Sequence, residues 1–244
     1  MMKKMALMIP LLLLSACSIT TEADRINAKL PSLSAEELLK EGNGRLEVKQ
    51  YVQARQYFKF LFENFPNSPQ AVQALLKMAD AFSRQGGLEN LLEARQRYVD
   101  FFSRFPQASE AENALYMQGR ISLDLKENPT RDPINTRMAL QTLSRYLQIY
   151  PTGAHAAQAR EGIRACTDQL ASHELDVARF YFKRKSYRAT LGRLEFIVKS
   201  YPDYSRMGEV HRLFAQVYRV LGDESTAEEY SRKASQAEGM PKNP

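Results

Sequence analysis

Apolar residues recur along this chain every three or four positions, which is the spacing of helices that bury one face. The clearest example runs from His173 to Pro202, where two apolar stripes flank a polar break at 183–186. The first stripe contains Leu175, Ala178, Tyr181 and Phe182, and the second contains Tyr187, Leu191, Leu194, Ile197 and Val198. Neither helix can bury its stripe alone. The pattern therefore predicts a helical hairpin that packs against further hairpins of the same kind.

Aromatic–proline pairs divide the chain into similar units. They are Phe65-Pro66, Phe105-Pro106, Tyr150-Pro151 and Tyr201-Pro202. Each pair is expected to end a helix, because proline has no N–H to donate and disfavours helical geometry in the residue before it. Twelve positions before the prolines stand the small residues Ala54, Ala94, Ala139 and Thr190, and eight positions before them the large residues Phe58, Tyr98, Leu143 and Leu194. This is the second-helix pattern of the tetratricopeptide repeat, in which the small residue lets two helices approach closely.

The first helix of each unit carries a small residue as well. These residues are Gly42, Ala79, Gly119, Ala178 and Ala215. Because good helix formers dominate and tryptophan is absent, we predict an all-α protein, an α-solenoid of about five tetratricopeptide-like helix pairs in 34–238. The predicted repeats are about 35–66, 69–106, 109–151, 154–202 and 207–236. Two features depart from the ideal repeat: an insertion at 127–135, where Asp132 can cap a helix that starts at Pro133, and an extended helix before His173.

The N-terminus resembles the signal peptide of a bacterial lipoprotein. Lys3 and Lys4 precede an apolar run at 5–14 that is too short to span a bilayer, and the run ends in Leu-Ser-Ala-Cys17, similar to a lipobox. We therefore expect cleavage of 1–16, covalent lipid on Cys17, a lipidated N-terminus and polar tether at 17–33, and a disordered tail at 239–244. The alternative is a secreted protein in which Cys17 stands by chance. By resemblance to Gram-negative lipoproteins, Ser18 suits sorting to the outer membrane, with the chain facing the periplasm.

Charge and motif content argue against nucleic-acid binding and against catalysis. Removal of Lys3 and Lys4 lowers the formal net charge from +6 to +4, and export leaves nucleic acid out of reach. The histidines His155, His173 and His211 lie on different predicted helices, so we predict no metal site and no cofactor other than the lipid. No phosphate loop or nucleophile elbow occurs. Cys166, inside a predicted helix, is interpreted as a small packing residue rather than a nucleophile.

Several motifs together resemble one known family. They are the lipobox, the repeats, Arg131-Asp132-Pro133 in the insertion, and the run from Leu170-Ala171-x-His173-Glu174 through Val177-Ala178, Tyr181, Arg184, Tyr187 and Arg193 to Tyr201-Pro202. Over nearly the whole mature chain they look like the outer-membrane assembly lipoprotein family BamD, formerly ComL. The resemblance implies a non-catalytic subunit of the BAM machinery that folds β-barrel proteins into the outer membrane. Its implied partners are the periplasmic domains of the BamA-type barrel insertase, other BAM lipoproteins and unfolded outer-membrane proteins.

Helical repeats bind many kinds of partner, so a second reading stays open. It is a periplasmic lipoprotein scaffold for peptidoglycan enzymes or for Tol-Pal-type envelope proteins. Like the first reading, it needs helical repeats on a lipid anchor and no catalytic residue.

Candidate contact residues fall in two groups. The resemblance places the insertase interface on the fourth and fifth repeats, with Arg184, Tyr187 and Arg193 as candidates; for Arg193 the alternative is an internal pair with a carboxylate, and Glu195 is near. First helices line the concave side of a solenoid, and there the sequence becomes basic from the third repeat on. The candidates for this client groove are Arg120, Arg179, Lys183 and Arg219, together with Phe65, which matches a family aromatic. Arginine could pair with a carboxylate of an unfolded strand. The alternatives are a solvated face for the basic residues and helix-end packing for Phe65.

Overall fold

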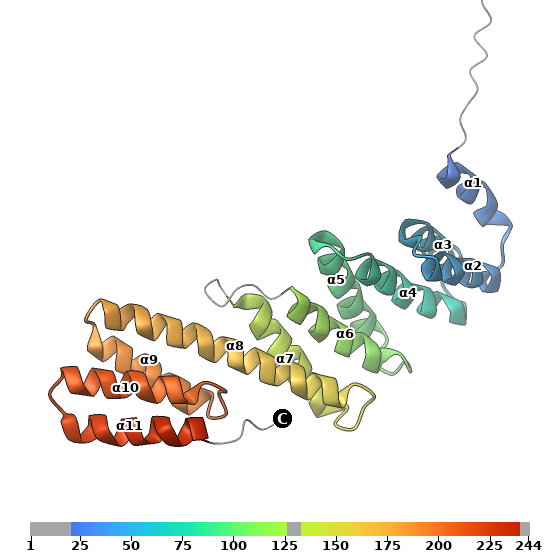
Figure 1. Ribbon diagram of the computed structural model, residues 1–244. Coiled ribbons are helices and arrows are strands. Elements are labelled where there is room, and N and C mark those ends of the chain that lie inside the picture. Colours follow the sequence, from blue (N-terminus) through green and yellow to red (C-terminus); the bar gives the residue numbers. More distant parts are fainter. Residues whose placement is uncertain (1–20, 126–132, 240–244) are drawn as a thin grey trace, which may run out of the picture.

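The computed structural model describes residues 21–125 and 133–239, and within these ranges the chain is built from helices (Figure 1). After α1 (Glu22–Lys29) and a 3-10 turn (Leu30–Ser32), the helices are α2 (Ala35–Glu47), α3 (Tyr51–Asn64), α4 (Pro69–Gln85), α5 (Leu88–Arg104), α6 (Ala111–Asp124), α7 (Ile134–Ile149), α8 (Ala156–Lys183), α9 (Tyr187–Ser200), α10 (Met207–Val220) and α11 (Glu224–Gly239). Each helix from α2 on packs mainly against the helices before and after it, so that five successive pairs form an elongated solenoid (Figure 1). The predicted all-α solenoid is confirmed. None of the described helices is both long and apolar enough to cross a bilayer.

The residues that were predicted to bring helices together are buried. Ala54, Ala94, Ala139 and Thr190 are all fully inaccessible to solvent. The space at Gly42 is so small that a Cβ atom there would lie 2.5 Å from Cε1 of Phe58. A Cβ atom at Gly119 would likewise lie 2.7 Å from Cδ2 of Leu143. The small residue of the first helix thus meets the large residue of the second helix within the same repeat.

The aromatic–proline pairs end four helices. Phe65, Phe105, Tyr150 and Tyr201 are the C-cap residues of α3, α5, α7 and α9, and the N–H of each donates to the carbonyl four residues earlier. At the third corner, the Tyr146 hydroxyl donates to Oε1 of Glu112 on α6 at 2.6 Å and accepts the His155 N–H at 3.0 Å. Burial, and then this bond to Glu112, raise the pKa of Tyr146 to about 12. These hydrogen bonds therefore fix the position at which α8 begins.

Helix α8 joins two hydrophobic cores. Its 28 residues are continuous and span about 42 Å at roughly 1.5 Å per residue. Ala156 and Ala159 belong to the central core, whereas Leu175 and Ala178 belong to the C-terminal core. Cys166 lies between these two ends and is fully buried, in agreement with its interpretation as a packing residue. The extended helix before His173 is thus one continuous helix that contributes side chains to two hydrophobic cores.

The segment expected to be a tether is helical from residue 22, and for residues 21–33 that expectation is wrong. Thr21 and Asp24 form a capping box at the start of α1. Ile26 and Leu30 are 4% and 5% exposed, and they belong to the N-terminal core together with residues of α2 and α3. Ion pairs from Glu22 to Arg45 and from Lys29 to Glu41, both at 3.1 Å, also join this segment to α2. The predicted signal peptide, Cys17 and residues 240–244 lie outside the described residues.

The insertion is described only in its last part. Helix α7 begins at Ile134, and Pro133 is its N-cap residue. The helix therefore begins one residue later than the predicted start at Pro133. The proposed cap Asp132 and the neighbouring Arg131 lie outside the described residues.

Candidate partner-binding surfaces

The three residues predicted for the insertase interface lie along the α8–α9 hairpin. Arg184 is the C-cap of α8 and Tyr187 is the first residue of α9. The turn between them is tight because Lys185 adopts a positive φ of 58° and the Ser186 N–H donates to the Tyr181 carbonyl at 3.0 Å. The turn holds Arg184 and Tyr187 at one end of the hairpin. Arg193 lies further along α9.

Large aromatic side chains are exposed on this hairpin. Phe180 is 51% exposed, and the guanidinium of Arg184 lies 4.7 Å from the centre of its ring. Phe196, on α9, is 44% exposed and contacts Tyr201 edge to face at 5.9 Å. Exposed aromatics beside arginine are typical of protein-binding surfaces. Sequence reasoning missed both phenylalanines, although each of them falls outside the apolar stripe of its helix.

Arg193 forms an ion pair within the hairpin. Its Nη1 lies 2.7 Å from Oε2 of Glu174 on α8. The side chain of Glu174 is 12% exposed and that of Arg193 is 44% exposed, so the acid is largely withdrawn from water and the arginine is not. The sequence had named the neighbouring Glu195 as the nearby acid, whereas the structure pairs Arg193 with Glu174. Arg193 therefore joins α9 to α8 and still presents part of its surface to solvent.

The predicted client groove carries less unpaired positive charge than its sequence suggested. Arg120 pairs with Asp124 at 3.4 Å, and Arg219 pairs with Glu224 at 3.4 Å. Arg179 pairs with Asp176 at 3.3 Å and also with Glu209 of α10. Of the predicted basic residues, Lys183 alone has no ion pair within the described part of the chain. The partner acids lie three to five residues away along the chain or in the next repeat, so considering each basic residue by itself did not identify them.

Arg179 and Lys183 meet in a depression between α8 and α10. It has a volume of about 290 Å³, and its lining comprises Arg179, Phe182, Lys183, Glu209, Arg212, Leu213 and Gln216. The bond from Arg206, followed by the one from Arg179, lowers the pKa of Glu209 to about 2, so this acid stays ionised. The lining of the depression thus combines the apolar side chains of Phe182 and Leu213 with charged side chains.

The other client-groove candidates lie elsewhere. Arg120 lines a separate depression between α6 and α8, and Arg219 lines one between α10 and α11. Phe65 lies in the first repeat, half-buried against the N-terminal core. The structure therefore brings together only two of the five predicted residues. Among residues 21–125 and 133–239, no three potential ligands of the His, Cys, Asp or Glu type gather around a metal position.

Comparison with known proteins gives one family. The family model YfiO, described as "Outer membrane lipoprotein", matches residues 31–233. A relative from Neisseria meningitidis serogroup A, "Outer membrane protein assembly factor BamD", is 29% identical over 242 residues, which cover 95% of this chain and 90% of the relative. A relative of the same name from Haemophilus influenzae is 29% identical over 201 residues, covering 78% of this chain and 75% of the relative.

Solved structures give weaker similarity. "Crystal structure of MamA protein" matches at 14% identity with a TM-score of 0.38, covering 86% of this chain and 98% of that one. A tetratricopeptide repeat protein from Parabacteroides merdae matches at 15% identity with a TM-score of 0.26, covering 85% and 94%. At these TM-scores the similarity supports no inference.

Proposed function

Because this chain belongs to the outer membrane lipoprotein family YfiO, we propose that it is an outer membrane protein assembly factor without catalytic activity. The observation that carries the proposal is the family match over 31–233, together with relatives named as assembly factors along most of the chain. A solenoid of helix pairs fits such a role, because it presents extended surfaces on which other proteins can be held.

We propose further that lipid on Cys17 anchors the chain to the outer membrane and that the solenoid faces the periplasm. Helix α1 begins at Glu22 and packs on the first repeat, as described above. The five residue steps from Cys17 to Glu22 reach about 18 Å at most. The anchor would therefore keep the first repeat close to the bilayer surface.

Substitution of the lipidated residue tests the anchor. We expect Cys17→Ser to move the protein from the membrane fraction to the soluble periplasm, because no described helix can replace the lipid as an anchor. The measurement is fractionation followed by immunoblotting, with Cys166→Ser as the matched control that keeps Cys17. Retention of the Cys17→Ser protein in the membrane would contradict lipid anchoring.

The α8–α9 hairpin is the proposed docking surface for the periplasmic domains of a barrel insertase. Arg184 and Tyr187 at its turn, Arg193 on α9, and the exposed rings of Phe180 and Phe196 would form it. The depression that holds Arg179 and Lys183 is the proposed contact for unfolded barrel strands, with Arg120, Arg219 and Phe65 as outlying contacts. Other lipoproteins of the same machinery would complete the assembly.

Photo-crosslinking tests this function. Arg193 is a poor position for the probe, since replacing it would break the pair with Glu174. Phe196 is better, because benzoylphenylalanine keeps an aromatic ring at an exposed position. We expect this probe in native membranes to capture a barrel insertase.

The control probe replaces Val52, which is 53% exposed on the first repeat, and it should not capture the insertase. If position 196 captures peptidoglycan enzymes or Tol-Pal-type proteins instead, the chain is an envelope scaffold of another kind.

A further inference from the structure

Exposed aliphatic side chains gather at the turns inside the first two repeats. Val48 is the C-cap residue of α2, and Val52 is the second residue of α3. Leu88 is the first residue of α5, and Leu92 follows it one helical turn later. All four side chains are between 41% and 66% exposed. Exposed apolar residues are ordinary when they are scattered singly, but a group of them on adjoining segments marks a contact surface.

Two polar contacts hold the α2–α3 turn beside the α4–α5 turn. Arg84, near the end of α4, lies 3.6 Å from the carboxylate of Glu47, the last residue of α2. Arg55, near the start of α3, donates to the side-chain oxygen of Gln85, the last residue of α4. Both turns therefore lie on the same edge of the solenoid (Figure 1). We call the surface formed by Val48, Val52, Leu88 and Leu92 the turn edge.

The N-terminal end of α1 is held at the turn edge as well. Glu22, its first residue, pairs with Arg45 in the last turn of α2 at 3.1 Å. The same guanidinium donates to the side-chain oxygen of Gln50, the N-cap residue of α3, at 2.6 Å. The proposed lipid on Cys17 is therefore at most about 18 Å of extended chain away from the α2–α3 turn. The opposite edge of the first repeat lies further away by the length of α3, about 21 Å for its 14 residues.

The charges at the turn edge do not favour a strongly charged partner. Glu47 and Glu22 are paired with arginines, as described above. Lys49, between the two valines, and Glu89, beside Leu88, have no ion pair within residues 21–125 and 133–239. These two opposite charges balance, so the aliphatic side chains are what distinguishes this edge. A lysine in such a turn can extend toward lipid headgroups while the neighbouring valines meet the acyl chains.

We propose that the turn edge contacts the inner surface of the outer membrane, with Val48, Val52, Leu88 and Leu92 at the boundary between headgroups and acyl chains. The inference rests on the proposed lipid anchor, because the anchor makes the contact intramolecular. An apolar contact that is too weak to hold a free protein is populated when the chain is tethered beside the surface. The contact would fix the orientation of the solenoid at the membrane, which a single anchor at the end of a short segment does not.

Spin-label accessibility tests the proposal. The full sequence with Val48→Cys or Leu88→Cys would be exported, and the mature chain would be labelled with a nitroxide and placed in phosphatidylethanolamine–phosphatidylglycerol vesicles. Cys166 is fully buried, so the chain without an introduced cysteine should take up little label. We expect labels 48 and 88 to collide with a water-soluble nickel chelate about 10-fold less often than a label in water, because they would lie at the acyl boundary. Vesicles of phosphatidylethanolamine alone should give the same result, since the contact is apolar.

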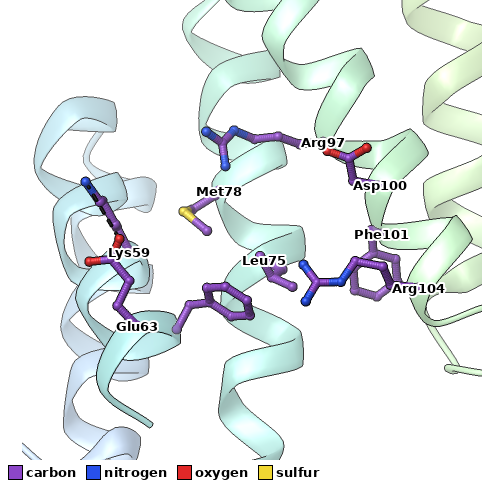
Figure 2. Close-up of a pocket in the computed structure, with 9 residues that line it drawn as sticks. Lys59, Glu63, Leu75, Met78, Arg97, Asp100, Phe101 and Arg104 are labelled. Carbon is purple, nitrogen blue, oxygen red and sulfur yellow. Dashed lines mark ion pairs between the residues drawn. The ribbon is translucent and has the colours of Figure 1, made fainter. Parts of the chain in front are cut away.

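The control label replaces Glu63, toward the other end of α3. Figure 2 shows Glu63 paired with Lys59, and its side chain is 57% exposed. Position 63 lies about 16 Å along α3 from Val52, so a label there should remain accessible to the nickel chelate. A variant with Val52→Asp and Leu92→Asp should raise the accessibility of label 48 to that of label 63 without releasing the chain from the vesicles. Circular dichroism should show that all these variants remain folded, since every substituted side chain is exposed.

Flotation with the vesicles distinguishes this inference from the anchor on which it rests. If the chain floats but labels 48 and 88 are as accessible to the nickel chelate as label 63, the proposal is overturned and the anchor stands. The turn edge would then face water or a protein partner. If the mature chain does not float, the anchor and the membrane contact are both overturned.

Discussion

Replacement of Gly42 by valine should destabilise the first repeat by about 3 kcal/mol, the upper part of the range for overpacked cores. Even the Cβ atom of the new side chain would lie 2.5 Å from Cε1 and 2.8 Å from Cδ1 of Phe58. The Phe58 ring is fully buried, so it has little room to move away. Valine favours a helix more than glycine does, but by less than about 1 kcal/mol, which is too little to offset the clash. Urea unfolding of the Gly42→Val protein would measure the loss.

Gly44, in the same helix, provides the matched control. A Cβ atom there would meet no atom within 4 Å, so Gly44→Val should leave stability unchanged or raise it by a few tenths of a kcal/mol. A second comparison combines Gly42→Val with Phe58→Ala. If the close approach is the cause, the double variant should lose less stability than the two single losses added together. Equal losses at Gly42 and Gly44 would show instead that valine is unfavourable anywhere in α2.

The pair of Gly42 and Phe58 also explains why the fold could be predicted in detail. A contact between a small residue and a large one depends on positions within a repeat, and those positions can be counted along the sequence. The aromatic–proline corners are local in the same way, since proline acts on the residue directly before it. The pairing of helices therefore followed from spacing alone.

Helix α1 shows where prediction from the sequence fails. Its apolar side consists of only Ile26 and Leu30, and its capping box uses Thr21 and Asp24. These signals are present in the sequence, but the mostly polar composition of the segment and its position after a motif similar to a lipobox favour a tether. Its burial depends on contact with apolar side chains of α2 and α3, and a short helix in isolation would be marginal. Tertiary packing decided the structure here.

The candidate sites were less predictable than the fold, because charges find partners across repeats. Arg179 pairs with Glu209, thirty residues later, and Arg193 pairs with Glu174, nineteen residues earlier. Helical periodicity tells which residues share one helix face, but not which residue of the next helix lies opposite. Phe180, by contrast, lies outside the apolar stripe of its helix, so periodicity alone could have identified its exposed ring.

Arg193 is consequently expected both to stabilise the hairpin and to contribute to insertase binding. Exchanging the charges of Arg193 and Glu174 can separate these two roles. Arg193→Glu places two acids opposite each other while Glu174 is only 12% exposed, so the hairpin should lose stability. Because Arg193 is itself 44% exposed, we expect a loss of about 1–2 kcal/mol, below that for fully buried pairs. Binding to the periplasmic domains of the insertase should fall by 10-fold or more, since the variant also places an acid on the proposed docking surface.

The exchanged variant, Glu174→Arg with Arg193→Glu, restores an ion pair between α8 and α9. Its unfolding temperature should return to within about 2 °C of the original protein, because roughly 1 kcal/mol corresponds to 2–4 °C in a chain of this size. Its affinity for the insertase domains should nevertheless remain at least 10-fold lower, since the positive charge no longer stands on α9. Recovery of affinity together with stability would mean that Arg193 acts only by holding the hairpin together. The docking surface would then consist of Arg184 and the aromatic residues of α8 and α9, and Phe180→Ala should weaken binding without changing the ion pair.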